Sequence, residues 1–293
     1  MESKVKNKIP VSNVAILLIG YNRPEFLRRR ISEISESKVE NLFISIDGGV
    51  KSRTAEMEDT KKFAQSKFSK LKYFEITHQE NNLGLGKHLS DSISIVLGKF
   101  EYIIVIEDDI RISNRFISNM IHGLTLQKEL GISGIVSGFS PIYLKHFANR
   151  WRISIYPYVW GWACSRELWL KYQYNLSGIN LEDQLNSSKT WNNFSLKQKN
   201  KWLNLFKKAQ ADPSDTWAIQ LCFWSFCYDF KNLTPIFSLV GNEGFNDVRS
   251  VHTKGKKPKF VTINKLNNNV VKRKNLIIGF WCKFIDKYWM GDV

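Results

Sequence analysis

Three consecutive acidic residues, Glu107, Asp108 and Asp109, end an apolar run at residues 102–106. The run has the length and composition of a strand buried on both faces, and ligands of open α/β sheets bind beyond the carboxyl ends of such strands. Neighbouring carboxylates repel each other unless a cation joins them, and Mg²⁺ or Mn²⁺ is the cation that prefers oxygen ligands. The triplet therefore predicts a divalent-metal site that also holds substrate phosphates. The alternative is a solvated turn or the acidic start of a helix that Ser113 caps.

Polar residues also follow two earlier strand-like runs. Asn22 and Arg23 come after residues 14–19, and Asp47 comes after residues 42–46. Because the carboxyl ends of parallel strands meet at one edge of a sheet, we expect all three side chains beside a bound nucleotide. The competing interpretations are a helix cap by Asn22 with a surface charge at Arg23, and an ordinary turn where Asp47 precedes two glycines.

A glycine-rich turn at residues 81–86 is followed directly by Lys87 and His88. Backbone amides at the start of a helix, together with a cationic side chain, can approach a diphosphate. The turn lacks the complete P-loop or dinucleotide-binding pattern, so a plain loop is an equally good interpretation. Lys87 and His88 are candidate phosphate-binding residues on this basis.

Three further candidates, Trp160, Gly161 and Trp162, lie in a predicted strand over residues 156–163. Aromatic rings form walls of sugar-binding sites, although core packing is the more frequent use of Trp in a buried strand. Later in the chain, His252 is a candidate ligand for a metal or a phosphate oxygen, because neutral imidazole binds both.

The elements that must position these residues alternate in type through the first half of the chain. Apolar runs predict strands at residues 14–19, 42–46, 71–77 and 102–106, and helical spacing predicts helices between them and after Ser113. This alternation indicates parallel strands joined by crossover helices. The second half is mixed: we expect strands at 132–136, 156–163 and 236–239 and helices at 166–172, 196–209 and 215–230.

Composition bounds the class of protein. The 293 residues include 43 Lys and Arg against 27 Asp and Glu, a net charge of +16, and 43% are hydrophobic. A disordered or fibrous chain is excluded, and one large domain or two small ones fit the length. The positive excess suits nucleic acid, an anionic membrane surface or a phosphate-rich substrate, and composition does not choose among them.

Membrane-spanning and export segments are not expected. No apolar run reaches the roughly 20 residues that span a bilayer, and the first ten residues lack the succession of a signal peptide. We therefore expect a cytoplasmic protein. The four cysteines form no CxxC pair and have no His at zinc-ligand spacing, which predicts small buried side chains without a disulfide or structural zinc.

Five blocks of this sequence, in consistent order, resemble one family. Residues 102–109, an apolar strand closing on Glu-Asp-Asp, look like the metal-binding variant of the DxD motif in nucleotide-diphospho-sugar glycosyltransferases of the GT-A fold. The similarity is to the N-acetylglucosaminyltransferase I-like group and related bacterial polysaccharide sugar transferases. The other blocks are residues 22–24, residues 45–48, residues 156–163 with Leu168 and Trp169, and residues 240–245 with His252 and Thr253. The resemblance covers about residues 13–253.

The resemblance implies a GT-A domain over residues 1–253, an α/β fold with a mixed central sheet flanked by helices. It implies a metal-dependent, inverting transfer of a sugar from a nucleotide-diphosphate donor, a UDP-sugar by preference, with Mn²⁺ or Mg²⁺ as cofactor. Asp109 would ligate the metal, Asp108 would reach the ribose or the metal shell, and Glu107 would bond the donor sugar. The implied acceptor is a saccharide or lipid-linked saccharide in the biosynthesis of a bacterial surface polysaccharide, such as lipopolysaccharide or capsule.

Roles for the remaining candidates follow from the same resemblance. Asp215, in the sequence Ser-Asp-Thr-Trp, is similar to the acid that serves as catalytic base, and the alternative is a cap or first-turn acid of the following helix. His252 would be a further metal ligand. The other donor-binding candidates are Asn22, Arg23, Asp47, Lys87, His88, Trp160, Gly161 and Trp162.

Residues 254–293 form a basic, aromatic extension. Apolar residues including Ile277 and Trp281 recur mostly at helical spacing among lysines, which is typical of a helix at an anionic membrane surface. A terminal helix packed on the domain itself is the alternative. If the extension forms a helix at a membrane surface, we expect peripheral attachment at the inner face of the cell membrane.

Other classes of protein remain as alternatives. A degenerate domain could bind sugar nucleotides without turnover. A basic nucleic-acid-binding protein would explain the net charge, but the chain shows no recognition motif and nucleic acid is not an expected partner. A glycoside hydrolase would use two carboxylates and has no need of an acidic triplet in a nucleotide-binding type of sheet. The sequence does not predict an oligomeric state.

Overall fold

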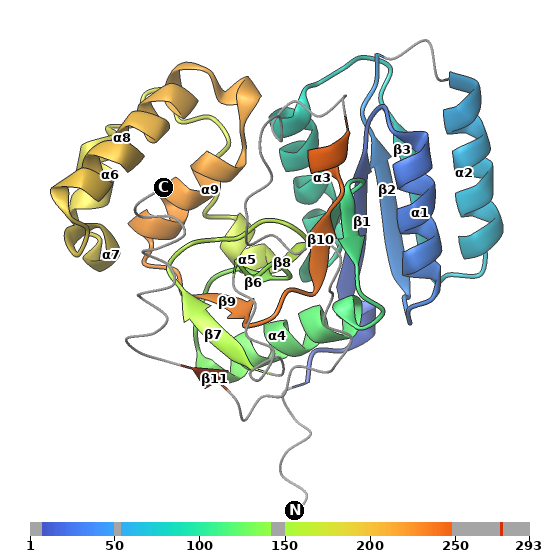
Figure 1. The fold of residues 1–293 in the computed structure, drawn as a ribbon, viewed down its shortest axis with the longest axis horizontal. Coiled ribbons are helices and arrows are strands. Elements are labelled where there is room, and N and C mark those ends of the chain that lie inside the picture. Colours follow the sequence, from blue (N-terminus) through green and yellow to red (C-terminus); the bar gives the residue numbers. More distant parts are fainter. Residues whose placement is uncertain (1–7, 50–53, 142–149, 248–275, 278–293) are drawn as a thin grey trace, which may run out of the picture.

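A mixed β-sheet with helices on both faces is the frame of the molecule (Figure 1). The computed structural model describes residues 8–49, 54–141, 150–247 and 276–277. Within these residues nine strands form one sheet in the order β11-β7-β9-β6-β8-β4-β1-β2-β3, and β10 pairs with β5 in a separate ribbon. The predicted fold class, a Rossmann-like α/β fold with a mixed central sheet flanked by helices, is confirmed.

The first half of the chain alternates strands and helices as predicted. Strands β4, β1, β2 and β3 are neighbours in that order and all run parallel. Helices α1 and α2 pack on each other on one side of these strands, and α3 lies on the other side (Figure 1). The elements are β1 (Val14–Gly20), α1 (Pro24–Ser35), β2 (Asn41–Ile46), α2 (Thr54–Phe68), β3 (Tyr73–His78), α3 (Leu85–Lys99) and β4 (Tyr102–Glu107).

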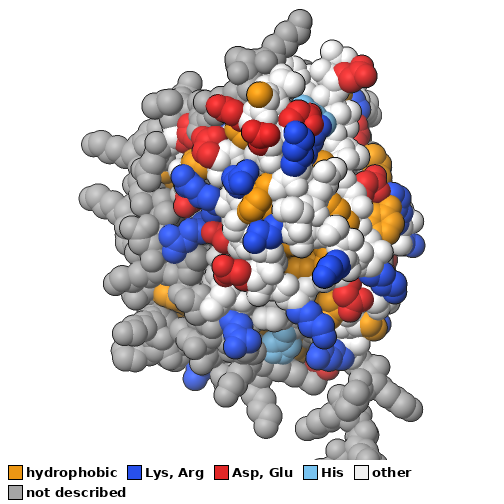
Figure 2. Space-filling model, turned by 90° about the vertical axis from the view of Figure 1, so that its right-hand side faces the viewer, with side chains coloured by type: hydrophobic (Ala, Val, Ile, Leu, Met, Phe, Trp, Pro, Cys, Tyr) orange, Lys and Arg blue, Asp and Glu red, His pale blue; other side chains and the backbone are white. Residues whose placement is uncertain are grey.

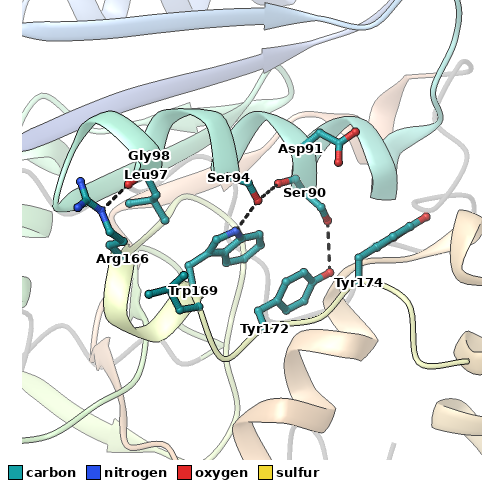
Figure 3. Close-up of a pocket in the computed structure, with 10 residues that line it drawn as sticks. Ser90, Asp91, Ser94, Leu97, Gly98, Arg166, Trp169, Tyr172 and Tyr174 are labelled. Atoms are coloured by element: carbon teal, nitrogen blue, oxygen red, sulfur yellow. Dashed lines mark hydrogen bonds between the residues drawn. The ribbon is translucent and has the colours of Figure 1, made fainter. Parts of the chain in front are cut away.

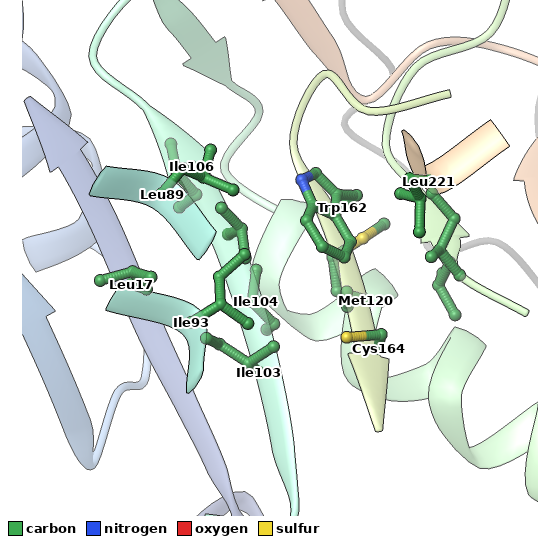
Figure 4. Packing of buried hydrophobic residues seen from close by; sticks show 14 of the residues in the cluster. Leu17, Leu89, Ile93, Ile103, Ile104, Ile106, Met120, Trp162, Cys164 and Leu221 are labelled. Atoms are coloured by element: carbon green, nitrogen blue, oxygen red, sulfur yellow. The ribbon is translucent and has the colours of Figure 1, made fainter. Parts of the chain in front are cut away.

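Burial explains why these runs became strands at these positions. All of β1 and β2 is buried, and so is β4 up to Ile106, whereas the edge strand β3 is half-buried to exposed. Leu89 and Ile93 of α3 pack beside Leu17 and the isoleucines of β4 (Figure 4). Each such side chain stabilises the fold by roughly 1.5–3 kcal/mol. This apolar layer fixes the strand ends that carry the polar residues.

The second half extends the same sheet with mixed strand directions. Strand β8 runs antiparallel to both β4 and β6, β9 runs parallel to β6 and antiparallel to β7, and β11 runs parallel to β7. The strands are β5 (Ile110–Ile112), β6 (Val136–Ser137), β7 (Trp151–Ser154), β8 (Trp162–Ser165), β9 (Asn232–Pro235), β10 (Val240–Asn242) and β11 (Leu276–Ile277), with α4 (Phe116–Leu130) packed on β6 and β8.

Helices of the second half pack around an aromatic cluster. Trp202 of α8 stacks on Tyr156, and Phe226 of α9 lies edge-on to both rings. A capping box at Ser195 and Gln198 starts α8. The elements are α5 (Arg166–Trp169), α6 (Leu181–Asn186), α7 (Lys189–Asn192), α8 (Leu196–Ala211) and α9 (Ala218–Cys227), with 3₁₀ turns η1 (Val11–Asn13), η4 (Pro213–Asp215) and η5 (Gly244–Asn246).

Several element predictions for the second half are wrong. The strand predicted over 156–163 is a loop up to Trp162, because Pro157 lacks a ladder donor and Gly161 adopts a left-handed φ of 55°. The strand predicted over 236–239 falls between β9 and β10. In that turn the Ser238 hydroxyl donates to the Val240 carbonyl oxygen. The strand predicted over 132–136 shortens to β6.

Helix starts and ends also differ from the predictions. Arg23 occupies the N-cap position of α1 that was predicted for Asn22, and it makes no side-chain cap bond. Ser113 does not cap α4, whose N-cap is Arg115. The helix predicted over 215–230 begins only at Ala218, because Thr216 is extended, and the one predicted over 166–172 ends at Trp169.

Most of the basic extension lies outside the described residues. Leu276 and Ile277 are the exception, and they pair with β7 instead of beginning the predicted amphipathic helix. Among the described helices, none combines the length and apolarity needed to cross a membrane. Cys164 and Cys222 are buried as predicted, whereas Cys227 is half-buried, and all three are free thiols.

Positive and negative side chains are interspersed on one face of the described part of the molecule. Figure 2 shows the face at the α2 side of the molecule, where Lys and Arg lie among Asp and Glu without a continuous patch of one sign. On α2 itself, Lys61 pairs with Glu58 at 2.5 Å. This face therefore lacks the one-sided basic surface typical of a nucleic-acid-binding protein.

Candidate functional site

The carboxyl ends of β1, β2 and β4 bring the predicted polar residues to one edge of the sheet. In the ladder, Ile19 of β1 lies opposite Glu107 of β4, and Gly20 lies opposite Ile46 of β2. The chain then leaves each strand with a polar residue or turn. Three segments that are distant in sequence thus end side by side, as the strand pattern predicts.

Arg23 joins two acids of the triplet. Its Nε donates to Oδ2 of Asp108 at 3.3 Å, and its Nη2 donates to Oδ1 of the same carboxylate. Its Nη1 donates to Oδ2 of Asp109 at 3.2 Å. The side chains are 16% exposed for Arg23, 3% for Asp108 and 14% for Asp109, so the pairing is shielded from water. The planar guanidinium group can donate two parallel hydrogen bonds to the two oxygens of one carboxylate, as it does to Asp108.

The single positive charge of Arg23 is less than the negative charge that the three acidic side chains would carry if all were ionised. Burial, together with the charges of Asp109 and Asp108, raises the pKa of Glu107 to about 8 against the opposing charge of Arg23. Burial raises the pKa of Asp108 to about 7 and raises the pKa of Asp109 as well, both against the opposing charge of Arg23. Buried carboxylates are costly without compensating charge. The cluster therefore favours a second cation or retained protons at neutral pH.

The ribbon of β5 and β10 is connected to the backbone of the acidic triplet. Strand β5 begins directly after Asp109, and the Asp109 carbonyl oxygen accepts from the Glu243 amide at 2.8 Å. Arg30, only 1% exposed, pairs with Glu33 at 2.8 Å and with Glu243 at 3.4 Å. The 240–245 block is thus beside the acids. The sequence did not single out Arg30 or Glu33, and the signal it offered was a charged residue, Arg30, on the same helix face as the apolar residues Leu27 and Ile34.

Asp47 ties two loops together at the end of β2. Its Oδ1 accepts from the amides of Gly48 and Leu83, both at 2.9 Å. Asn82 reaches back to the Tyr21 hydroxyl at 2.9 Å, next to half-buried Asn22. The glycine-rich turn therefore lies against the first-strand turn, and at least one oxygen of Asp47 is engaged in holding it there.

The structure separates Lys87 and His88. Lys87 is exposed and pairs with Asp91 one helical turn along α3. His88 is 1% exposed and hydrogen-bonds through Nε2 to the Ser45 hydroxyl at 2.8 Å, which in turn contacts Ser92 at 2.9 Å. Burial lowers the pKa of His88, which favours the neutral ring. Neither Lys87 nor His88 has a contact that brings its side chain to the acidic triplet.

Trp160, Gly161 and Trp162 pack within the protein. Trp160 is half-buried against Phe139 and Phe245, and a side chain at Gly161 would meet Val240 at 2.9 Å. Trp162 is fully buried and stacks on Trp217 with ring centroids 5.4 Å apart. These contacts are those of core packing, the alternative to a sugar-binding role for these residues.

Asp215 ends the η4 turn, and His252 lies outside the described residues. The turn packs against α3: the Tyr174 hydroxyl donates to the Pro213 carbonyl at 2.7 Å, and a Cβ on Gly86 would be 3.1 Å from the Thr216 carbonyl oxygen. Gly86 belongs to the first turn of α3, which follows the carboxyl end of β3. The backbone at Asp215 is therefore on the same edge of the sheet as the acidic triplet.

The donor set fits a divalent ion only when the substrate supplies further oxygens. Among the described residues, no group of three His, Cys, Asp or Glu side chains could hold a metal ion by itself. Arg23 engages both oxygens of Asp108 but only Oδ2 of Asp109. One or two carboxylates plus phosphate oxygens and water is a common coordination for Mg²⁺. Of the two aspartates, Asp109 keeps one oxygen that Arg23 does not engage, which a cation shared with a phosphorylated ligand could use.

Comparisons with known proteins give a distant structural likeness. No protein-family model matches the chain, and no curated protein sequence matches it. Among solved structures, the chain is similar to a UDP-glucose pyrophosphorylase, "complexed with UDP-glucose", at 11% identity and a TM-score of 0.39. The match covers 77% of this chain and 91% of that one. The function of this chain has to be inferred from its own site.

Proposed function

We propose that this protein is a glycosyltransferase that takes a sugar from a nucleotide-diphosphate donor, with a UDP-sugar as the preferred donor. The observation that carries the proposal is the buried acidic triplet at the carboxyl edge of the parallel strands, which Arg23 neutralises only in part. A Mg²⁺ or Mn²⁺ ion bound together with a diphosphate would supply the missing positive charge. The sequence resemblance to GT-A enzymes supports the same chemistry.

The residues of the edge divide the work of holding the donor. Asp109 would hold the cation, and Glu107 would accept hydrogen bonds from the donor sugar. Arg23 keeps Asp108 and Asp109 in fixed positions, so that the carboxylates need not reorganise when the donor arrives. The cation would stabilise the negative charge that develops on the departing nucleoside diphosphate.

Asp215 is our candidate for the catalytic base. A hydroxyl oxygen of the acceptor would form a bond to the anomeric carbon while the bond from that carbon to the diphosphate oxygen breaks. The acceptor proton would pass to the Asp215 carboxylate, and attack from the side opposite the leaving group inverts the configuration. The position of the η4 turn on the triplet's edge of the sheet supports this role. The acceptor we propose is a saccharide or a lipid-linked saccharide.

Calorimetry and donor turnover test the proposal through Asp109→Asn. We expect wild-type protein to bind UDP only when Mn²⁺ or Mg²⁺ is present, and to hydrolyse or transfer the sugar of at least one nucleotide sugar. Asp109→Asn should weaken binding of the cation that stabilises the departing diphosphate, and loss of one such electrostatic stabiliser lowers kcat by about 10²–10³-fold. Asp59→Asn, on the exposed face of α2, is the matched control and should behave like wild type.

Three outcomes would contradict parts of the proposal. Metal-independent binding of UDP, or activity that survives Asp109→Asn, would remove the role assigned to Asp109 and the cation. Binding of UDP, GDP, CDP and dTDP without turnover of any corresponding sugar donor would favour a binding module that has lost catalysis. Absence of binding to all four nucleotides would remove the nucleotide-sugar function itself.

A further inference from the structure

A groove of 380 Å³ runs along α3 (Figure 3). Its other wall is the segment from α5 to Tyr174. The α3 residues that line it extend from Ser90 to Gly98, a distance of roughly 12 Å at 1.5 Å per residue. The volume is within the range of small-molecule sites, and none of the residues assigned above to the nucleotide site lines it.

The lower wall of the groove is built from two stacked aromatic rings. Trp169 and Tyr172 lie parallel, with centroids 4.2 Å apart and planes at 17°. Trp169 donates from Nε1 to the Ser94 hydroxyl at 3.0 Å, and the Tyr172 hydroxyl lies 3.4 Å from that of Ser90 (Figure 3). These bonds hold the rings in one orientation against α3. A fixed aromatic wall needs no ordering when a ligand binds.

The polar lining is balanced in charge. Its two ionised groups are Asp91, half exposed and paired with Lys87, and Arg166, whose guanidinium donates to the Phe100 carbonyl at 3.0 Å. Ser90, Ser94 and Tyr174 add hydroxyl groups to the lining, and Tyr174 lies at the end of the groove beyond Asp91 (Figure 3). Acceptors, donors and hydroxyls beside an aromatic wall match a ligand with many hydroxyl groups and no net charge. A strongly charged ligand would find no excess of the opposite sign.

The groove leads from one edge of the sheet to the other. At one end the Arg166 amide donates to the Glu101 carbonyl at 2.8 Å, just before β4 begins. At the other end the Tyr174 hydroxyl holds the Pro213 carbonyl, within the turn that carries Asp215. A chain of sugars in the groove would therefore extend toward the carboxyl edge, where the proposed transfer takes place.

We infer that the groove between α3 and the segment from α5 to Tyr174 binds an uncharged saccharide, and that it holds the remote sugar units of the acceptor. The second part rests on the proposed function. The first part does not, because binding of a saccharide to this groove needs neither donor nor turnover.

Gly98 provides a variant that closes the groove without disturbing the fold. It lines the groove near the end of α3, and a Cβ built there meets no atom within 4 Å. Gly98→Gln would place a long polar side chain in the groove and replace a poor helix former by a good one. Ala55→Gln adds the same side chain on exposed α2 and serves as the matched control.

The experiment is saturation-transfer NMR with maltotriose, cellotriose, chitotriose and mannotriose as separate probes, without nucleotide. At least one trisaccharide should bind wild type and Ala55→Gln, and its affinity for Gly98→Gln should fall at least tenfold with no loss of melting temperature. No binding of any probe, or equal binding by Gly98→Gln, would overturn the inference.

Calorimetry with UDP and Mn²⁺ on the same proteins separates this inference from the proposed function. Trisaccharide binding without nucleotide binding would leave the groove assigned and the transferase function rejected. Nucleotide binding in all variants without trisaccharide binding would reject the groove alone. A Gly98→Gln protein that binds UDP like wild type but has lost the trisaccharide supports both.

Discussion

Arg23 is the residue on which the candidate site depends most directly. Its guanidinium is the group that the structure places against both Asp108 and Asp109, and all three side chains are largely withdrawn from water. In such a cluster the loss of one partner is expensive, because the remaining charges stay buried without compensation. The same bonds that orient the acids for a ligand also stabilise the empty fold.

Replacement of Arg23 should therefore lower stability strongly. We expect Arg23→Leu to reduce the free energy of unfolding by about 3–5 kcal/mol in urea titrations. Arg23→Lys should also lower the free energy of unfolding, but by less, because one ammonium group cannot bind both oxygens of Asp108 as the guanidinium does. Adding Asp108→Asn to Arg23→Leu should recover stability by removing the stranded charge. Additive losses in the double variant would show that the pair is not coupled.

His88 should make stability depend on pH. Its ring is buried against Ser45, and burial lowers its pKa below the ordinary value of 6.5, although the charges of Asp47 and Asp91 oppose the shift. The unfolded state then binds more protons than the folded state as pH falls below about 6.5. The contribution of neutral His88 is complete above that pH and is lost on acidification, by up to about 1.4 kcal/mol per pH unit.

The measurement is the free energy of unfolding between pH 7.5 and pH 5 for wild type and His88→Gln. The variant starts from lower stability because it disturbs the bond to Ser45, but its curve should lack the added acid slope. Parallel curves would mean that His88 is protonated equally in both states. The difference between the two proteins isolates His88 from the acidic cluster, whose raised pKa values act in the opposite direction.

Sequence reasoning at this scale identified groups but not their partners. It expected Arg23 and the triplet on one edge, and they are there, but the ion pairs between them depend on a side-chain geometry that the sequence does not encode. It treated Lys87 and His88 alike, whereas successive residues of a helix point about 100° apart, so one is exposed and the other buried. Trp160 and Trp162 were ambiguous because ring stacking in a core and against a sugar use the same residue type.

At the scale of elements, the turn after β2 is the tightest packing near the site. A Cβ on Gly48 would lie 2.2 Å from the Gln79 carbonyl oxygen and 2.8 Å from the Asn81 amide, both backbone atoms. Asp47 binds the same loop through the Leu83 amide. The loop that follows β3 is thus pressed directly on the end of β2, with no room between the two backbones.

A pair of glycine variants checks this packing. Gly48→Ala should lower the free energy of unfolding by about 1–3 kcal/mol, since backbone must move to accept the methyl group. At Gly98 a new Cβ has open space around it. Gly98→Ala should therefore raise the free energy of unfolding by about 0.5–1 kcal/mol, because alanine favours the helix more than glycine does. Thermal or urea unfolding of both proteins gives the comparison. A neutral Gly48→Ala would mean that the two backbones separate easily.

Elements with a strong pattern were predictable and short ones were not. The parallel strands are buried on both faces and read as unbroken apolar runs, so β1, β2 and β4 were found within about one residue of their bounds. The ribbon of β5 with β10 was missed. Each strand has three residues, too few for periodicity, and the pairing joins Ile110 to Asn242 across more than half the described chain.

At the scale of the whole molecule, the two halves of the sheet differ in how far their pairings reach along the chain. In the first half α1 and α2 connect neighbouring parallel strands and α3 returns the chain to the other side of β1, so that all four strands run parallel. In the second half strand direction is mixed, and the order β7-β9-β6-β8 inserts a late strand between two earlier ones. No local pattern encodes such an insertion, which is why the fold class could be predicted and this topology could not.

That insertion has a consequence for the order in which the protein can form during synthesis. Strand β6 lies between β8 and β9, and the Asn232 side chain accepts from the Ile135 amide just before β6. Strand β9 in turn supplies the neighbour of β7. While the ribosome has made only the first hundred or so residues, β1, β2, β3 and β4 can already pair. The segments around residues 136 and 151, in contrast, keep open strand edges until residue 235 has emerged. Chaperone contact during translation would therefore fall on the middle of the chain, between a finished parallel half of the sheet and a late strand that completes the rest.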